Sequence, residues 1–376
     1  MFEKIVLIFI ILIILFFIYL KIWYRFWTSQ PVFNTFNLFQ WIKPSGIIHH
    51  SIGEKYLKFY NPKIITNNYQ EIPTEKKALI YYFSSPNLSK NQYLSQYSNS
   101  TNKIYISTQY DITATPLSNL DNAYSKKLTQ YMITKTVNSH INNKKFLVSF
   151  INDYHIHSSI NNFHDTYYKL FYTHYYNTRK MNCPPIFLFK SEKKLPYLVP
   201  CTTFHNVYFD TKYLDILNTK IPNNLSIHLI NPQNFDLFYH FIGEINSNFT
   251  FFTIPDSQNF KSMISNNLIK PVLLLDETKV VGGMIFKLTK NTISLIGSYY
   301  FPKYIDFMLE SLQNSLYLLK KNHLFKTLVI KNISHNDQIL KKILVRKSPL
   351  KNTADYLYFF NFAIKPFKSN NCLVIY

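Results

Sequence analysis

The sequence predicts an α/β protein with a mixed sheet, built as two similar halves behind one N-terminal membrane helix. Hydrophobic residues make up 47% of the 376 residues, which supports a sizeable core and excludes a disordered chain. Near the middle, residues 146–179 read as an apolar, β-branched strand, a polar turn and a helix. The order of hairpin, helix and strand then recurs after residue 210, which predicts a second α/β half.

The first element is an uncharged apolar run from Ile5 to Leu20. With the flanking Lys21, Trp23 and Tyr24 it reaches about 20 residues, enough to cross a bilayer. The alternative is a cleaved signal peptide. The length of the run and the bulky aromatics at the expected cleavage position favour an uncleaved, single-pass anchor. Lys21 and Arg25 then place the body of the protein in the cytosol by the positive-inside rule.

The formal net charge of +21 is compatible with nucleic acid, an anionic membrane surface or a polyanionic ligand such as a coenzyme. Lys and Arg are scattered without a dense run, so we expect no nucleic-acid binding. The richness in Lys, Asn, Ile, Phe and Tyr, with only 6 Gly, is typical of AT-biased coding. Cys183, Cys201 and Cys372 have no paired spacing, which argues against disulfides and a zinc site.

Between the anchor and the middle of the chain, Ala78–Ser85 is strand-like, and the polar tract that follows to Asn102 reads as a surface loop. Strands are then expected at Leu128–Val137 and Phe146–Ile151. They are joined by Asn142-Asn143-Lys144, which suits a hairpin turn with left-handed backbone.

The turn after Ile151 leads into a helix predicted from Tyr167 to Arg179. A strand, turn and helix in this order can hold a phosphate on the helix-start amides, or it can be an ordinary βα connection. Four histidines crowd the region: His155, His157, His164 and His174. No Cys or carboxylate set accompanies them, so no metal site is expected. They are solvated loop histidines or include a general base.

Strands and helices alternate in the second half. The expected strands are Leu225–Ile230, Val272–Leu275, Val280–Leu288, Thr292–Ser298, Thr327–Lys331 and Asp355–Phe362. The expected helices are Asn234–Ile245, Ile305–Lys321 and Asp337–Leu344. Gly282-Gly283, inside a strand, indicates a bulge or a close backbone approach.

The stretch RFWTSQPV directly after the anchor resembles the F-W-x-T-Q-P-V signature of the N-myristoyltransferase family, within the GNAT acyltransferase superfamily. In that family the segment lies over acyl-CoA. The resemblance implies that Arg25 meets a coenzyme phosphate and that Phe26 and Trp27 cover adenine or pantetheine, with Gln30 in the same motif. It also implies a tandem of two GNAT-like halves, here residues 25–210 on the acyl-CoA side and 211–376 on the acceptor side, behind an anchor at 1–24.

The resemblance extends through the central hairpin. Phe150 and Ile151 fall at the family's oxyanion-hole positions, where two backbone amides hold the thioester oxygen. The chain from Pro184 to His205 reads as the hairpin that follows. The phosphate turn departs from the family's basic pattern, because it contains Asp165 and has no Lys or Arg before Lys169. Lys169 is therefore the nearest cation for a coenzyme phosphate.

The C-terminal DYLYFFNFAIKPF and CLVIY resemble the family's closing strand and tail. The family uses its terminal carboxylate as the base that deprotonates the acceptor amine, and this role would fall to Tyr376. A terminal strand packed on the core is the alternative interpretation.

These observations lead to two functional hypotheses. The first is a membrane-anchored acyltransferase that uses acyl-CoA, either myristoyl-CoA or acetyl-CoA, with an amine such as an N-terminal glycine as acceptor. The second is a catalytically degenerate relative that serves as a binding or structural component of a membrane or a virion. The composition and the anchor fit a large DNA virus, where such relatives occur.

Overall fold

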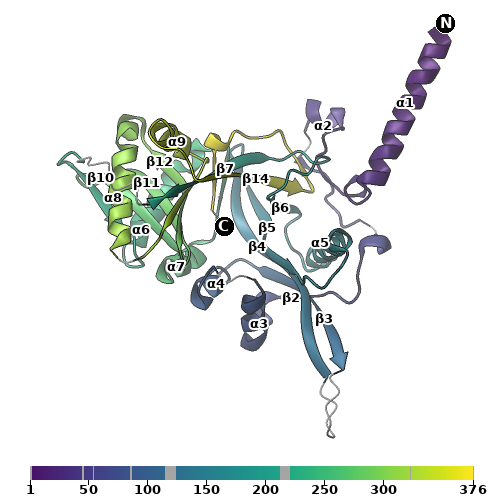
Figure 1. Ribbon diagram of the computed structural model, residues 1–376, viewed down its shortest axis with the longest axis horizontal. Helices are drawn as coiled ribbons and strands as arrows, with labels where there is room; N and C mark the ends of the chain where they lie inside the picture. Colours follow the sequence, from purple (N-terminus) through teal and green to yellow (C-terminus); the bar gives the residue numbers. More distant parts are fainter. Residues whose placement is uncertain are drawn as a thin grey trace.

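The α/β prediction is confirmed: a large mixed sheet runs through the molecule, with helices packed on both faces (Figure 1). Within the described chain, 14 strands form this sheet, and 12 of them follow one another in the order β16-β9-β4-β5-β6-β14-β7-β13-β12-β11-β10-β8. The computed structural model describes residues 2–44, 46–53, 55–84, 87–114, 124–211, 221–321 and 323–375.

For description, the strands are divided by their position in the sequence into a first group up to β7 and a second group from β8 onward. The first group comprises β1 Gly46–Ile47, β2 Ile65–Asn68, β3 Ile104–Ala114, β4 Tyr124–Ile141, β5 Lys144–Ile156, β6 Ile186–Ser191 and β7 Thr202–Asp210. The second comprises β8 Leu225–Leu229, β9 Phe251–Ile254, β10 Ile269–Asp276, β11 Lys279–Leu288, β12 Thr292–Tyr300, β13 Thr327–Lys331, β14 Lys351–Phe360, β15 Phe362–Ala363 and β16 Cys372–Val374.

The helices divide in the same way. The first half holds α1 Phe2–Trp23, α2 Leu38–Ile42, α3 Thr74–Ser84, α4 Lys90–Ser95 and α5 Phe163–Lys180, and the second holds α6 Phe235–Ile245, α7 Ser257–Ser265, α8 Met308–Lys320 and α9 Asn336–Leu344.

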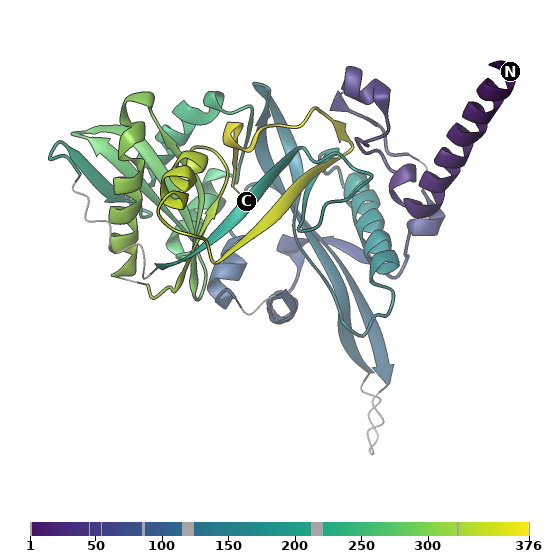
Figure 2. The ribbon, with the colours of Figure 1, turned by 45° about the horizontal axis from the view of Figure 1, so that its top comes forward.

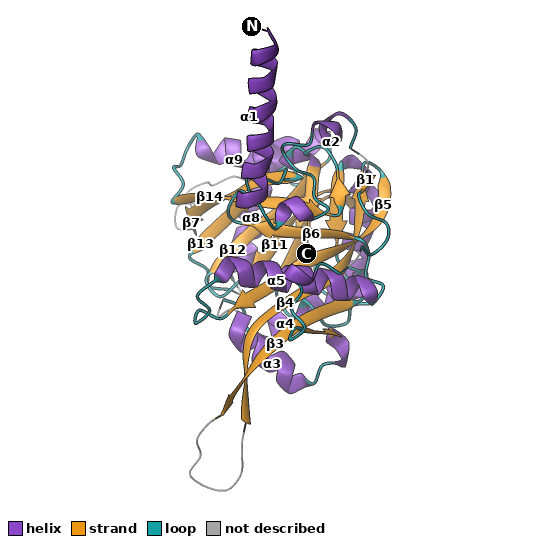
Figure 3. Cartoon of the chain, turned by 90° about the vertical axis from the view of Figure 1, so that its right-hand side faces the viewer, coloured by secondary structure: helices purple, strands orange, loops and turns teal. Residues whose placement is uncertain are grey.

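The central hairpin forms as predicted. Strands β4 and β5 pair from Ile141 and Lys144 onward, and the turn residues Asn142 and Asn143 have φ of 49° and 62°. Alternate β4 side chains point to opposite faces. Met132 therefore packs with α5, while Ile133 packs with the layer of α3 and α4. Figure 3 shows α5 crossing the sheet on one of these faces.

The strand prediction at 78–85 is wrong, because residues 78–84 lie in helix α3, and Ser85 lies outside the described residues. Its eight mostly apolar residues have no period that separates a strand from a helix. One face of the helix is buried and the other is exposed to solvent, since Ile80 is fully buried while Tyr82 is exposed. The polar tract that follows is also more ordered than predicted. It contains α4, which begins with a capping box between Ser89 and Gln92, a pattern that was readable in the sequence.

The hairpin predicted between Pro184 and His205 is also wrong. Strands β6 and β7 are not neighbours, because β14 lies between them and pairs with both. The local run of two strands and a turn could not reveal a third strand from about 150 residues later in the chain. As a result, a strand from the second half completes the sheet of the first.

The predicted elements of the second half are present with small shifts of their ends. A 3-10 turn, Pro302–Phe307, occupies the start of the helix predicted from Ile305. Strand β9 and helix α7 were not predicted. The close approach expected at the glycine pair is confirmed, since a Cβ on Gly282 would lie 2.3 Å from the ring of Tyr300.

Helix α1 projects from the body with its apolar side chains exposed (Figures 1 and 2). It has 22 residues and is long and apolar enough to cross a membrane. Its middle is not isolated from the body, because the ring of Phe16 packs edge-on against Phe36 at 5.4 Å between centroids.

Candidate functional site

Strands β5 and β6 run parallel side by side and then separate. Within the described residues they pair only from Val148 with Ile186 to Phe150 with Leu188. Beyond this point β6 continues to Ser191, paired on its other edge with β14, and β5 continues to Ile156. The two facing edges therefore open into a split that begins at Phe150 and Leu188.

A bulge in β5 marks the start of this split. Thr134 of β4 lies opposite Ile151 and Ile133 lies opposite Asp153, so Asn152 is the extra residue. A bulge bends its strand and increases the local twist, which turns β5 away from β6. Phe150, predicted for the oxyanion hole, is thus the last β5 residue that pairs with β6. Ile151, the second residue predicted for the oxyanion hole, is the first β5 residue inside the split.

The second half repeats this geometry. Strand β12 pairs in parallel with β13 only as far as Leu295 with Ile330, within the part of the chain that the structure describes. The bulged residue, Ile296, follows directly. Here the chain itself fills the split. The amide of Ser298 donates to Ser334 Oγ at 2.9 Å, and the C-terminal tail packs on Gly297 through Leu373.

Asp153 is the titratable group closest in sequence to the bulge. Its Oδ2 accepts hydrogen bonds from the hydroxyls of Tyr93 and Tyr131, both at 2.9 Å. Burial raises its pKa to about 6, although the two tyrosine hydrogen bonds lower it and so oppose the rise. A carboxylate with this pKa is ionised at neutral pH yet basic enough to accept a proton.

Two lysines belong to the surroundings of Asp153: Lys287, which interacts with it electrostatically, and Lys190, which interacts with Lys287. Lys287 of β11 has its pKa lowered to about 8, because it is removed from water and because Lys190 of β6 repels it, while Asp153 partly offsets both effects. Lys190 in turn lies 3.5 Å from Asp355 of β14. The group combines side chains from both halves at the mouth of the split.

Lys135 is a third lysine, and it lies opposite Phe150 on β4. It is fully buried, and its ammonium donates to Asn259 Oδ1 at 2.6 Å and to the carbonyl of Gln96 at 3.3 Å. Removal from water lowers its pKa to about 7, and the charge of Asp256 partly offsets this effect.

The segment after the anchor packs against the other side of the split. Phe26 stacks on Tyr168 of α5, with 4.4 Å between ring centroids, and Trp27 lies parallel to Phe189 at 5.9 Å. Phe189 is the first β6 residue beyond the paired region. Both side chains are buried and share one hydrophobic cluster with Ile151.

The C-terminal tail reaches the middle of the molecule, between the two halves (Figures 1 and 2). Strand β16 runs parallel to β9, and the amide of Ile375 donates to the carbonyl of Thr253 at 3.0 Å. Ile375 is fully buried, and Val374 belongs to the same hydrophobic cluster as Phe150. Tyr376, the predicted base, lies outside the described residues.

Three solved structures of Saccharomyces cerevisiae N-myristoyltransferase, all with bound myristoyl-CoA, are similar to this chain over most of its length. One covers 94% of this chain and 99% of the yeast chain, with a TM-score of 0.62 and 13% identity. Another covers 92% and 89%, with a TM-score of 0.64 and the same identity. The chain has the N-myristoyltransferase fold. No protein-family model matches the sequence, and a search of curated proteins found no significant match.

The turn before α5 leads into a helix N-terminus, where backbone amides can hold an anion such as a phosphate. Helix α5 is capped by Asn162, whose side chain accepts from the amide of Asp165. Lys169, the predicted phosphate ligand, pairs with Asp165 at 2.7 Å. The amides of Phe163 and His164 have no hydrogen-bond partner within the described chain and can donate to an anion.

The remaining predicted ligands lie on the surface side of the N-terminal segment. The side chain of Arg25 is exposed, and Gln30 donates to Ser29 Oγ at 3.0 Å. The segment is held in place by Asn361, which is fully buried and has a φ of 62°. Its amide donates to the carbonyl of Pro31 at 2.6 Å.

Of the four histidines, His174 belongs to the core. It is fully buried between the hydroxyls of Ser107 and Thr134, and burial lowers its pKa to about 3. His155 and His157 lie beside the ring of Phe83. His174 therefore stays neutral and has a structural role.

Sequence reasoning did not identify Asp153, Lys135, Lys190 or Lys287 as site residues. Asp153 carried a readable signal, since it is a lone carboxylate at the end of an apolar strand. The lysines carried none, because 41 Lys and Arg residues are spread throughout the chain. Only the fold buries Lys135 and brings Lys190 and Lys287 close to carboxylates.

Proposed function

We propose that the chain is a membrane-anchored acyltransferase that moves an acyl group from acyl-CoA to an amine. The observation that carries this proposal is the separation of β5 from β6 beyond Phe150, beside the bulge at Asn152. An extended ligand can enter between two strands whose facing edges no longer pair, because their backbone groups are then open to it. The likeness to proteins solved with bound myristoyl-CoA favours a thioester with a long acyl chain.

In the proposed reaction, the amides of Phe150 and Ile151 stabilise the negative charge that develops on the thioester oxygen. The amine nitrogen bonds to the carbonyl carbon, and the carbon–sulfur bond then breaks. The amine proton passes to a carboxylate, and the coenzyme leaves as a thiolate that takes up a proton. Asp153 is our candidate for this carboxylate, together with the terminal carboxylate of Tyr376 predicted from sequence.

We propose an amine at the end of a peptide, such as an N-terminal glycine, as the acceptor. Residues from the second half, including Lys287, lie across from the split. The acceptor nitrogen must approach Asp153 from that side, because α5 and the N-terminal segment occupy the opposite face.

A second candidate function is a scaffold that has the fold without catalysis. It is favoured by the turn at 157–162, which has no Lys or Arg, and by the pairing of Lys169 with Asp165. A pyrophosphate at this turn would meet two free amides and a nearby carboxylate. The scaffold would be a membrane or virion component.

Calorimetric titration of myristoyl-CoA and CoA into the full chain in lipid nanodiscs tests the proposal. We expect Asp165→Asn to strengthen binding of both ligands about two- to fivefold, because it removes a like charge near the phosphates and frees Lys169. Asp337→Asn is the matched control, since Asp337 forms the same i, i+4 pair with Lys341 at the start of α9. Failure of the folded chain to bind either ligand would contradict the acyltransferase proposal and favour the scaffold function.

The membrane part of the proposal rests on α1 and on a second apolar surface. Leu38, Phe39 and Ile42 of α2 are exposed, and Phe36 beside them packs on the middle of α1. If α1 spans a bilayer, the geometry puts α2 at the level of the interface and the apolar side chains in lipid. Lys21 and Arg25 favour a cytosolic body.

We therefore expect a tryptophan introduced by Phe39→Trp to report a lipid environment. Its difference emission, variant minus parent, should be blue-shifted and quenched by brominated lipids in nanodiscs. Tyr317→Trp on α8 is the control, because Tyr317 is also exposed but belongs to the second half. Equal, red-shifted emission from both variants would contradict insertion of α2.

A further inference from the structure

A second candidate binding region lies at the opposite end of α5 from the phosphate turn. It is a pocket of about 740 Å³. The pocket is lined by Ile47, His50, Ser51, Ile52, Lys145, Phe146, Leu147, Arg179, Asn182, Cys183, Pro184, Pro185 and Ile186. Arg179 lies near the end of an 18-residue helix, which spans roughly 27 Å at 1.5 Å per residue. The pocket is therefore distinct from the proposed coenzyme site.

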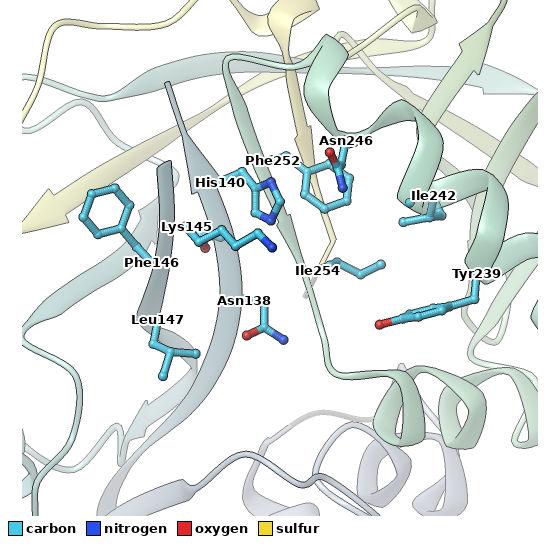
Figure 4. A pocket seen from close by; sticks show the side chains of 12 residues that line it. Asn138, His140, Lys145, Phe146, Leu147, Tyr239, Ile242, Asn246, Phe252 and Ile254 are labelled. Atoms are coloured by element: carbon cyan, nitrogen blue, oxygen red, sulfur yellow. The ribbon is translucent and has the colours of Figure 1, made fainter. Parts of the chain in front are cut away.

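The charges in the lining have one sign. His50, Lys145 and Arg179 are basic, and none of the 13 lining residues, all of them described, is acidic. Lys145 also borders the neighbouring pocket on the other side of β5, of about 390 Å³. Figure 4 shows its side chain extending into that space, toward Asn138 and His140. Arg179 is therefore the principal fixed charge of the larger pocket.

Arg179 is a buried cation without a carboxylate partner in the described chain. It is 9% exposed. Its Nη1 donates to the carbonyl of Cys183 at 3.3 Å and its Nη2 to that of His50 at 2.9 Å. Its Nε is buried and has no hydrogen-bond partner. The two carbonyls satisfy donors but leave the charge uncompensated, and a buried charge ordinarily has a counterion.

The wall also has apolar side chains, beside the polar Ser51 and Asn182. Ile47, Ile52, Phe146, Leu147 and Ile186 contribute aliphatic and aromatic surface, and Leu147 is half exposed. Such a wall binds an apolar body, while Arg179 binds an acid group.

We propose that this pocket binds an amphiphilic anion, with its carboxylate or phosphate near Arg179 and its apolar chain along the wall. A fatty acid and a lipid phosphate share this chemistry. The site does not depend on the acyl-transfer proposal, because it uses none of the residues at the split.

Saturation-transfer NMR on the full chain in nanodiscs tests this site, with hexanoate, hexyl phosphate, neutral hexanamide and inorganic phosphate as probes. We expect the two amphiphilic anions to bind at least tenfold more tightly than hexanamide. Arg179→Met should abolish that difference, while Arg346→Met, at an exposed arginine, should leave it unchanged.

A second pair of variants covers the risk that Arg179→Met fails to fold. Asn182 lines the pocket, is exposed and has a φ of 60°, which Asp and Gly both tolerate. Asn182→Asp should weaken hexanoate at least fivefold by like-charge repulsion, and Asn182→Gly should not. Equal affinity for hexanoate and hexanamide would overturn the proposal. Equal affinity for inorganic phosphate and hexyl phosphate would overturn the amphiphile assignment.

Discussion

Replacing Asp153 by Asn is expected to lower the rate of acyl transfer at pH 7.5 by about 10²- to 10⁴-fold, the usual contribution of a general base. Asn has the same shape and keeps an acceptor for Tyr93 and Tyr131. The fold should therefore survive, and circular dichroism of the variant in nanodiscs would confirm it. Release of the coenzyme thiol, followed with a thiol reagent, measures the rate.

The pH dependence separates a base from a structural residue. The rate of the parent chain should rise as pH increases through about 6, because Asp153 loses its proton there. Tyr131→Phe removes a hydrogen bond that favours the ionised form of Asp153, so the rising limb of the pH–rate profile should move to higher pH. Asp153→Asn should lack the limb. Retention of both rate and limb in this variant would exclude Asp153 as the base and favour the carboxylate of Tyr376.

The same carboxylate affects stability in a defined direction. Its pKa is higher in the folded chain than the ordinary value of 3.8, so the folded state binds more protons between the two values. The free energy of unfolding should therefore fall as pH rises from about 4 to about 6. Asp153→Asn should lose this part of the pH dependence.

Gly297→Val is expected to destabilise the protein by about 1–3 kcal/mol, the usual cost of overpacking a core. A Cβ at Gly297 would lie 2.3 Å from Leu373 Cδ1, and Leu373 is itself buried. The new side chain must displace the tail from the second split. Thermal unfolding followed by circular dichroism measures the effect.

Two further variants locate the cause in the tail. Gly53→Val should have little effect, because nothing lies within 4 Å of a Cβ at Gly53. Leu373→Ala should cost about 2–5 kcal/mol alone, yet combined with Gly297→Val it should cost less than the sum. Strict additivity would show that the two residues do not compete for one space. A loss of acyl transfer greater than the loss of folded protein would support a catalytic tail.

The sequence by itself determined the elements whose signals are local. The apolar run of α1, the left-handed turn at Asn142 and Asn143, and helix α5 each follow from composition or periodicity within about 20 residues. The motif around Trp27 pointed to the fold, and the likeness to yeast N-myristoyltransferase agrees with it. These features form because backbone preference and side-chain spacing agree locally.

Only the tertiary structure decided which strands are neighbours and which polar groups are buried. The insertion of β14 between β6 and β7 joins residues about 150 positions apart. The run that was predicted as a strand forms helix α3 instead, and this helix buries Ile80 against the sheet. Asp153 became a candidate base because chain segments distant in sequence remove it from water and supply Tyr93 and Tyr131. Burial and pairing are sums over non-local contacts, and they set the strand order and the pKa of Asp153.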